Sequence, residues 1–250
     1  MNKHAYELWL IWQNPQTRQR YHIGRLLHDS DSYSFRYENS GYRRKLKEAM
    51  ENGYKPHLAF PDINKTYSSN KLFGPFARRL PDNKRPDFHS ILQDLGLPTD
   101  YTNMDLLRAT GGRLATDTYE FVAPIFTSNS HFDFDFYIAG WRHYDGDQII
   151  HNIQPGEQVR FELDPDNEQD SKAVIVLSDK YGKKLGYIPA FYSGFMYEVI
   201  KNSSTYNANI ATVNPKAVPQ LKVNIAVVGK FSKDLNKMDF KKDYEIQLLR

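Results

Sequence analysis

Cysteine is absent from this chain of 250 residues. Its absence excludes disulfides, thiol nucleophiles and thiolate zinc sites as sources of stability or chemistry. A chain without cysteine fits a reducing compartment, and we expect a cytoplasmic protein.

Long apolar runs are also missing. The run from Leu8 to Trp12 is much too short for a signal peptide, and no small-residue cleavage site follows it. No stretch approaches the roughly 20 apolar residues that a membrane-spanning helix needs. We therefore expect no membrane association.

The common enzyme signatures do not occur. The sequence contains no G-x-x-x-x-G-K-[ST], G-x-G-x-x-G, G-x-S-x-G or H-E-x-x-H motif, and its eight histidines are scattered. The acidic stretch Asp164–Lys172 places carboxylates at alternate positions, but Gln169 stands where a calcium loop needs glycine. A metal-dependent nuclease built on this stretch stays an alternative, while a solvated turn is the simpler interpretation. We expect no enzyme, no metal and no cofactor.

Charge is distributed unevenly. Residues 127–215 contain 7 Lys/Arg and 12 Asp/Glu, whereas residues 1–126 contain 18 and 14, and residues 216–250 contain 8 and 4. The acidic middle segment does not favour binding of nucleic-acid phosphates by electrostatic attraction alone.

The first half predicts a mixed α and β domain over residues 1–126. Strands are expected at 6–13, 20–27 and 33–38, with a turn at Asn14-Pro15. Three or four short helices are expected next, among them one capped by Ser69 and one over Met104–Thr110. The polar, aperiodic segment 127–133 is interpreted as a linker.

The second half, residues 134–250, predicts a small β-barrel with one helix. Short strands are expected at 134–141, 158–164, 173–179, 184–189, 206–213 and 222–231. A helix is expected near 190–201, and one more strand in the C-terminal tail. The predicted fold class is therefore α+β, a mixed domain followed by an OB-like barrel.

Three ordered blocks of the second half attract attention: "GWRHYDG" at 140–146, "DPDNEQDSKAVIV" at 164–176 and "GKKLGYIP" at 182–189. In this order and at these spacings they resemble the pattern of a HIRAN domain, over about residues 134–232. The resemblance implies a compact β-barrel and binding of single-stranded DNA, at a 3′ end in the best-understood members.

The resemblance also implies site residues. Arg142, His143 and Tyr144 would lie at the ligand, Asp170 would accept a hydrogen bond from the terminal sugar hydroxyl, and Tyr187 would flank the same pocket. We add Lys172, a cation close to Asp170, to the predicted nucleic-acid-binding residues. The sequence departs from the family pattern where His143 replaces a tyrosine, Leu163 an arginine and Gln169 a tyrosine. Alternatively, the rings pack at the mouth of the barrel and bind nothing.

The first half resembles the small N-terminal subdomain of HipA-type kinases over about residues 5–124. The likeness rests on the order "LWLIWQ", "HLAFPD", "LFGPFARRLPD" and "MDLLRATGGRLATDTYEF". It implies a protein-contacting domain, with Arg78, Arg79 and Asp82 as possible partner-facing residues. Alternatively, this half is a scaffold without a kinase partner.

The sequence therefore predicts a non-enzymatic protein that binds single-stranded DNA or DNA ends through its second half. A place in a HipA-type toxin–antitoxin or defence module would follow from the first half. The alternative is a protein-interaction regulator, an antitoxin-like inhibitor of a HipA-type kinase that binds no DNA.

Overall fold

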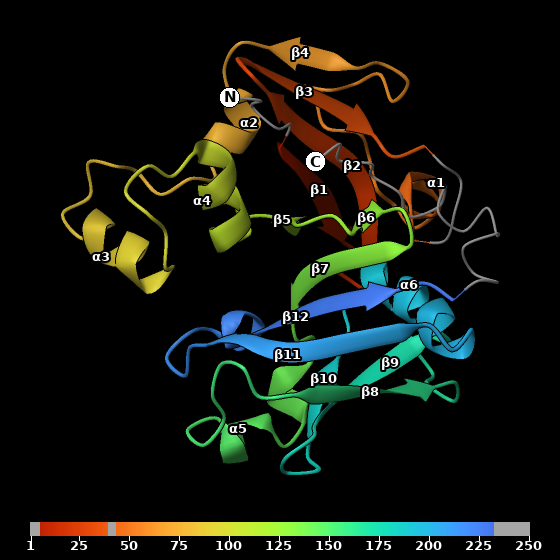
Figure 1. Ribbon diagram of the computed structural model, residues 1–250. Coiled ribbons are helices and arrows are strands. Elements are labelled where there is room, and N and C mark those ends of the chain that lie inside the picture. Colours follow the sequence, from red (N-terminus) through yellow and green to blue (C-terminus); the bar gives the residue numbers. More distant parts are fainter. Residues whose placement is uncertain (1–5, 40–43, 233–250) are drawn as a thin grey trace. The chain divides into compact units, whose positions relative to one another are not determined.

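A computed structural model describes residues 6–39 and 44–232 of the chain (Figure 1). The chain divides into two compact units, with the boundary between Pro124 and Ile125. Each unit has its own sheet system and core, and each is described here by itself.

The N-terminal unit is built on an antiparallel five-stranded sheet of order β4-β3-β2-β1-β5. Its strands are β1 (Tyr6–Gln13), β2 (Arg20–Asp29), β3 (Ser32–Tyr37), β4 (Tyr67–Ser69) and β5 (Tyr119–Val122). The turn between β1 and β2 forms because Asn14 Oδ1 accepts the backbone N–H groups of Gln16 and Thr17 at 2.8 and 3.0 Å. The predicted hairpin at Asn14-Pro15 is confirmed.

In the described part of this unit, four short helices accompany the sheet: α1 (Leu46–Glu51), α2 (Gly74–Ala77), α3 (Phe88–Asp94) and α4 (Asn103–Thr110). Helix α4 begins at a capping box, in which Thr102 and Asp105 satisfy each other's backbone N–H groups, and it ends at Gly111 with φ of 67°. Ser69 does not cap a helix, because it belongs to edge strand β4 and its hydroxyl accepts the N–H of Lys71. The predicted cap at Ser69 was therefore wrong, and the helix in this stretch, α2, begins only at Gly74.

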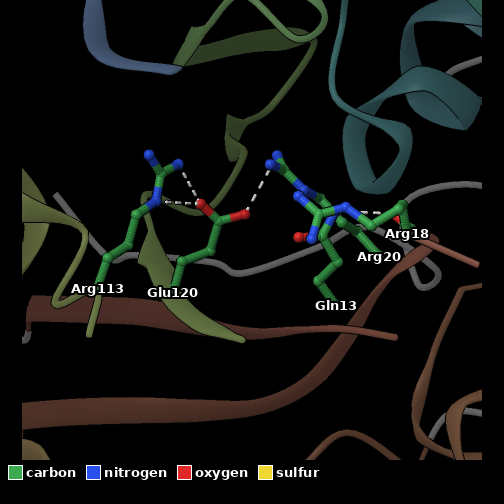
Figure 2. A network of polar contacts seen from close by, with 5 residues as sticks. All are labelled: Gln13, Arg18, Arg20, Arg113 and Glu120. Carbon is green, nitrogen blue, oxygen red and sulfur yellow. Dashed lines mark hydrogen bonds and ion pairs between the residues drawn. The ribbon is translucent and has the colours of Figure 1, made fainter. Parts of the chain in front are cut away.

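Buried charge also holds the N-terminal unit together. Figure 2 shows the carboxylate of Glu120, on β5, between two guanidinium groups. Arg20 Nη1 lies 3.2 Å from Oε1, and Arg113 Nε donates to Oε2 at 2.9 Å. Burial favours the neutral acid, yet the two guanidinium groups hold the pKa of Glu120 below its ordinary value. The carboxylate is therefore charged at neutral pH and ties β5 to the start of β2.

Up to residue 232, the C-terminal unit forms two antiparallel sheets (Figure 1). The first has the order β10-β9-β8, with β8 (Val159–Asp164), β9 (Ala173–Ser178) and β10 (Lys184–Tyr187). The second has the order β11-β12-β7-β6, with β6 (Phe126–Ser128), β7 (His131–Tyr137), β11 (Thr205–Val213) and β12 (Val223–Lys230). Single bridges connect the sheets, at Ala139–Tyr187 and Gln158–Asn209.

The described residues do not form the closed barrel that we predicted. Isolated bridges replace the continuous ladders that would close one sheet on itself. The observed fold is an α+β arrangement of small antiparallel sheets with few helices. Its helices are α5 (Gly146–Ile149) and α6 (Ala190–Lys201), with short 3₁₀ turns at Trp141–His143 and Pro219–Leu221.

The core of this unit follows from the alternation in β7. Phe132, Phe134 and Phe136 point inward, at 2 to 3% exposure, while the polar residues between them are more exposed. Phe195 of α6 packs against Phe132 and Phe134, with ring centroids 5.2 and 5.8 Å apart. Helix α6 is thereby fixed against the four-stranded sheet.

Residues 127–133, which we predicted as a linker, lie in a β-hairpin instead. Thr127 pairs with Phe132, and the turn uses Asn129 at a φ of 53°. Thr127 and Phe132 are buried, so the segment belongs to the fold of the C-terminal unit rather than to a connection. The strand predicted in the C-terminal tail lies outside the described residues. Among the helices that the structure describes, none has the length and apolar character to cross a bilayer.

Candidate functional site

The "GWRHYDG" stretch forms a tight turn after β7. Gly140 adopts a φ of 76°, which reverses the chain into the 3₁₀ turn Trp141–His143. Trp141 is only 1% exposed, and its indole Nε1 donates to Asp147 Oδ1 at 2.7 Å. A Cβ on Gly146 would lie 2.5 Å from the Trp141 ring, so only glycine leaves room there. Trp141 is therefore a core residue.

A pocket of about 290 Å³ opens beside this turn. The 3₁₀ turn, the loop before β9, the end of β10 and the start of α6 all contribute to its walls. The side chains that line it include His143, Tyr144, Asn167, Asp170, Tyr187 and Ala190. The three predicted motifs therefore meet around one cavity, although they are distant in sequence.

Two tyrosine rings form one wall of the pocket. The rings of Tyr144 and Tyr187 meet edge to face with centroids 5.5 Å apart. Lys184 Nζ lies 4.4 Å from the Tyr144 centroid and 4.2 Å from the Tyr187 centroid. Burial raises the pKa of both phenols, so they stay neutral at physiological pH. The wall is thus aromatic, with a cation against it.

The Tyr187 hydroxyl is held from three sides. It donates to Asp164 Oδ2 at 2.6 Å and accepts from Lys184 Nζ at 2.7 Å. Asn167 Nδ2 lies 3.2 Å from the same hydroxyl and 3.1 Å from Asp164 Oδ2. Hydrogen bonds from Tyr187 and Asn167 lower the pKa of Asp164. This network fixes the ring of Tyr187 before any ligand arrives.

Asp170 is positioned by the loop before β9. Asn167 Oδ1 accepts the N–H of Asp170 at 3.1 Å, and Asp170 Oδ1 accepts the N–H of Lys172 at 2.8 Å. Asp170 Oδ2 lies 3.0 Å from the Ser193 hydroxyl of α6. The carboxylate therefore sits in the pocket wall in one orientation, as a hydrogen-bond acceptor.

Four of the six predicted nucleic-acid-binding residues line the pocket: His143, Tyr144, Asp170 and Tyr187. The other two lie outside its lining. Arg142 is exposed on the turn, and its Nε donates to His143 Nε2 at 3.0 Å. Lys172 turns towards α6, where its Nζ lies 2.7 Å from Glu198 Oε1.

Sequence reasoning missed Lys184, Asn167 and the role of Asp164. Lys184 and Tyr187 are three residues apart in β10, so a regular strand would direct them to opposite faces. A bulge lies between Lys184 and Gly186, and Lys184 Nζ contacts the rings of both Tyr144 and Tyr187. Gly186 marks this bulge, with a φ of 147° and no room for a Cβ beside Ala139 O. A glycine inside a strand pattern was the signal that could have indicated it.

In the N-terminal unit, the predicted partner-facing residues differ in their exposure to solvent. Arg78 and Asp82 are exposed. Arg79 is only 9% exposed, and its guanidinium is occupied by both carboxylate oxygens of Asp117 and by Gly112 O. The prediction that Arg79 faces a partner was wrong, because this arginine forms an internal, bidentate ion pair.

Comparison with known proteins gives a family for part of the chain. A sequence model of the HIRAN domain matches residues 131–232. The crystal structure of the HIRAN domain of human HLTF is 16% identical, with a TM-score of 0.38, over 49% of this chain and 98% of that one. A Lactobacillus plantarum protein of known crystal structure is 14% identical, with a TM-score of 0.35, over 39% of this chain and 92% of that one. No curated protein matches the chain.

The matched segment starts at the first residue of β7 and includes all three motifs around the pocket. It leaves the N-terminal unit outside, so the resemblance of that unit to HipA-type kinases stays a prediction. Residues 131–232 of this chain form a HIRAN domain.

Proposed function

We propose that this protein is a non-enzymatic nucleic-acid-binding protein that holds single-stranded DNA, or a DNA end, in the pocket of its HIRAN domain. DNA binding is the general expectation for such a domain. The observation that carries the proposal for this chain is the meeting of Tyr144, Tyr187 and Asp170 around one cavity.

The aromatic wall suits a nucleobase. Every base has a π face, and stacking on an aromatic side chain contributes about 1–3 kcal/mol per base. Lys184 and the network around Asp164 hold the two rings in place, so little ordering of the wall opposes binding. The volume of about 290 Å³ is at the small end for ligand pockets and suits one nucleoside-sized group.

The acceptor in the wall suits a hydroxyl. A carboxylate accepts hydrogen bonds and repels a phosphate, so Asp170 favours a strand that ends in a free hydroxyl over one that ends in a phosphate. The backbone N–H of Lys172 and the hydroxyl of Ser193 hold the carboxylate in this orientation. We therefore propose that the pocket takes the 3′-terminal nucleoside, with the sugar hydroxyl towards Asp170.

Cations around the pocket would supply the phosphate contacts. Arg142 is exposed on the turn, and Lys184 lies against the aromatic wall. With two or three such contacts to a single strand, affinity should fall roughly 10-fold between about 50 and 200 mM salt. The acidic composition of the segment argues for modest affinity and for recognition of the end rather than of a long stretch of backbone.

Fluorescence anisotropy with three ligands tests the proposal. The ligands are one single-stranded oligonucleotide with a free 3′-hydroxyl, the same oligonucleotide with a 3′-phosphate, and a blunt duplex with both 3′ ends blocked. We expect the tightest binding to the free 3′-hydroxyl. Equal binding to the first two ligands would show that Asp170 does not recognise the 3′-terminal hydroxyl. No binding to any ligand at low salt would refute the proposed function.

A further inference from the structure

Helix α6 starts at the pocket and leads away from it. Ala190, its first residue, lines the pocket, and the Ser193 hydroxyl lies 3.0 Å from Asp170 Oδ2. The same face of the helix continues through Tyr197 and Lys201, because residues four apart lie one above the other. Ser193 is 1% exposed, Tyr197 is partly exposed and Lys201 is exposed, so this face rises from the pocket wall to the surface.

Two lysines flank the ring of Tyr197. Lys172 Nζ, from the loop that also carries Asp170, lies 5.6 Å from the ring centroid, and Lys201 Nζ lies 5.8 Å from it. Glu198 forms an ion pair with Lys172 at 2.7 Å and so keeps that lysine beside the helix. Two ammonium groups and one carboxylate leave a net positive charge around an aromatic ring.

We propose that Tyr197, Lys172 and Lys201 form a second contact for the strand whose end lies in the pocket. This inference rests on the proposed function. The ring offers a stacking surface for a base, and the two ammonium groups complement phosphodiester groups on either side of it. This lysine-flanked tyrosine gives Lys172, which does not line the pocket, a role in binding the inner part of the strand.

The length of the helix indicates which nucleotides it can reach. Ser193 and Lys201 are eight residues apart, which is about 12 Å along the axis. At about 3.4 Å per stacked nucleotide, this distance corresponds to roughly three or four nucleotides beyond the one in the pocket, and Tyr197, halfway along, lies roughly two beyond it. A dinucleotide would therefore fill only the pocket, whereas an octanucleotide with the same 3′ end would also reach the second contact.

Binding of these two oligonucleotides to variants of the full chain tests the inference. We expect Tyr197→Leu to weaken octanucleotide binding about 5-fold or more, because one base–ring stack is lost. Lys201→Gln should weaken it less and reduce the salt dependence by about one phosphate contact. Neither variant should change dinucleotide binding. Lys65→Gln is a matched control, since Lys65 Nζ lies 5.3 Å from the Tyr67 ring centroid in the other unit.

Each other outcome contradicts the inference in a distinct way. If both variants bind the octanucleotide as tightly as the wild type does, the second contact does not exist, while the proposed function stands. If Tyr197→Leu weakens the dinucleotide and the octanucleotide equally, Tyr197 acts only through the shape of the pocket. If the wild-type chain binds neither oligonucleotide, both the proposed function and this inference fail.

Discussion

Replacing Tyr187 with phenylalanine removes one hydroxyl and leaves the ring that forms the pocket wall. The lost hydroxyl donates to Asp164 Oδ2 at 2.6 Å and accepts from Lys184 Nζ at 2.7 Å. A hydrogen bond to a charged group contributes about 1.5–3 kcal/mol when it is shielded from water. Asp164 is partly exposed, so we expect the change to lower the free energy of unfolding by only about 1 kcal/mol at pH 7.

The size of this effect should depend on pH. Hydrogen bonds from Tyr187 and Asn167 hold the pKa of Asp164 below its ordinary value, so the folded state favours the charged carboxylate. The resulting stabilisation is fully present above the unfolded pKa of about 3.9 and is lost as the pH falls through the lower, folded pKa. The difference between wild type and Tyr187→Phe should therefore be largest at neutral pH and shrink in acid.

Urea unfolding of both chains at pH 7 and at about pH 3 measures this difference. Tyr181→Phe is the control, because the Tyr181 hydroxyl donates to the uncharged Asn152 O at 3.1 Å and its loss should cost the same at both pH values. A Tyr187→Phe effect that is as independent of pH as that of the control would refute the charged network around Asp164.

Three further substitutions test other parts of the structure. Gly186→Ala forces a side chain into a φ of 147° and 2.3 Å from a carbonyl oxygen, so thermal unfolding should show a loss of about 2 kcal/mol or more. Glu120→Gln leaves Arg20 and Arg113 without their carboxylate, and urea unfolding should show a loss of about 2 kcal/mol that disappears in acid. Lys184→Met removes the cation beside the aromatic wall, so anisotropy titrations should show weaker DNA binding and a shallower salt dependence.

Much of the fold follows from local patterns. A strand was predicted over most of β7, where phenylalanine alternates with aspartate, and Asn14-Pro15 predicted a hairpin. Thr102 and Gly111 bound a helix where the sequence predicted one. These features depend on neighbours within a few residues, so they can be recognised without the tertiary structure.

The errors concern interactions between distant residues. Closure of the barrel depends on whether two sheets exchange many hydrogen bonds or single bridges, and local periodicity does not contain that information. Arg79 pairs with Asp117, 38 residues away, so its exposure could not be inferred from its place in a motif. The segment 127–133 contains few apolar residues and was therefore interpreted as a linker.

The candidate site was predictable to the extent that its residues belong to the HIRAN motifs. Tyr144, Asp170 and Tyr187 meet at one pocket, in agreement with the resemblance of the sequence. Lys184 was not predicted, because it reaches the rings of Tyr144 and Tyr187 only through a bulge in β10. Lys184 lies beside both tyrosines and so supplies a cation at the aromatic wall. The family pattern has an arginine at position 163, where this chain has leucine.

The most direct test of the central claim compares Tyr144→Ala with the wild type in binding a short single strand with a free 3′-hydroxyl. Tyr144 lines the pocket, and loss of one stacking surface should weaken binding about 10-fold or more while circular dichroism shows an unchanged fold. Tyr181→Ala is the matched control, because this ring also lies beside a lysine but not in the pocket lining. If folded Tyr144→Ala binds as tightly as the wild type and the control do, the pocket is not the nucleic-acid site.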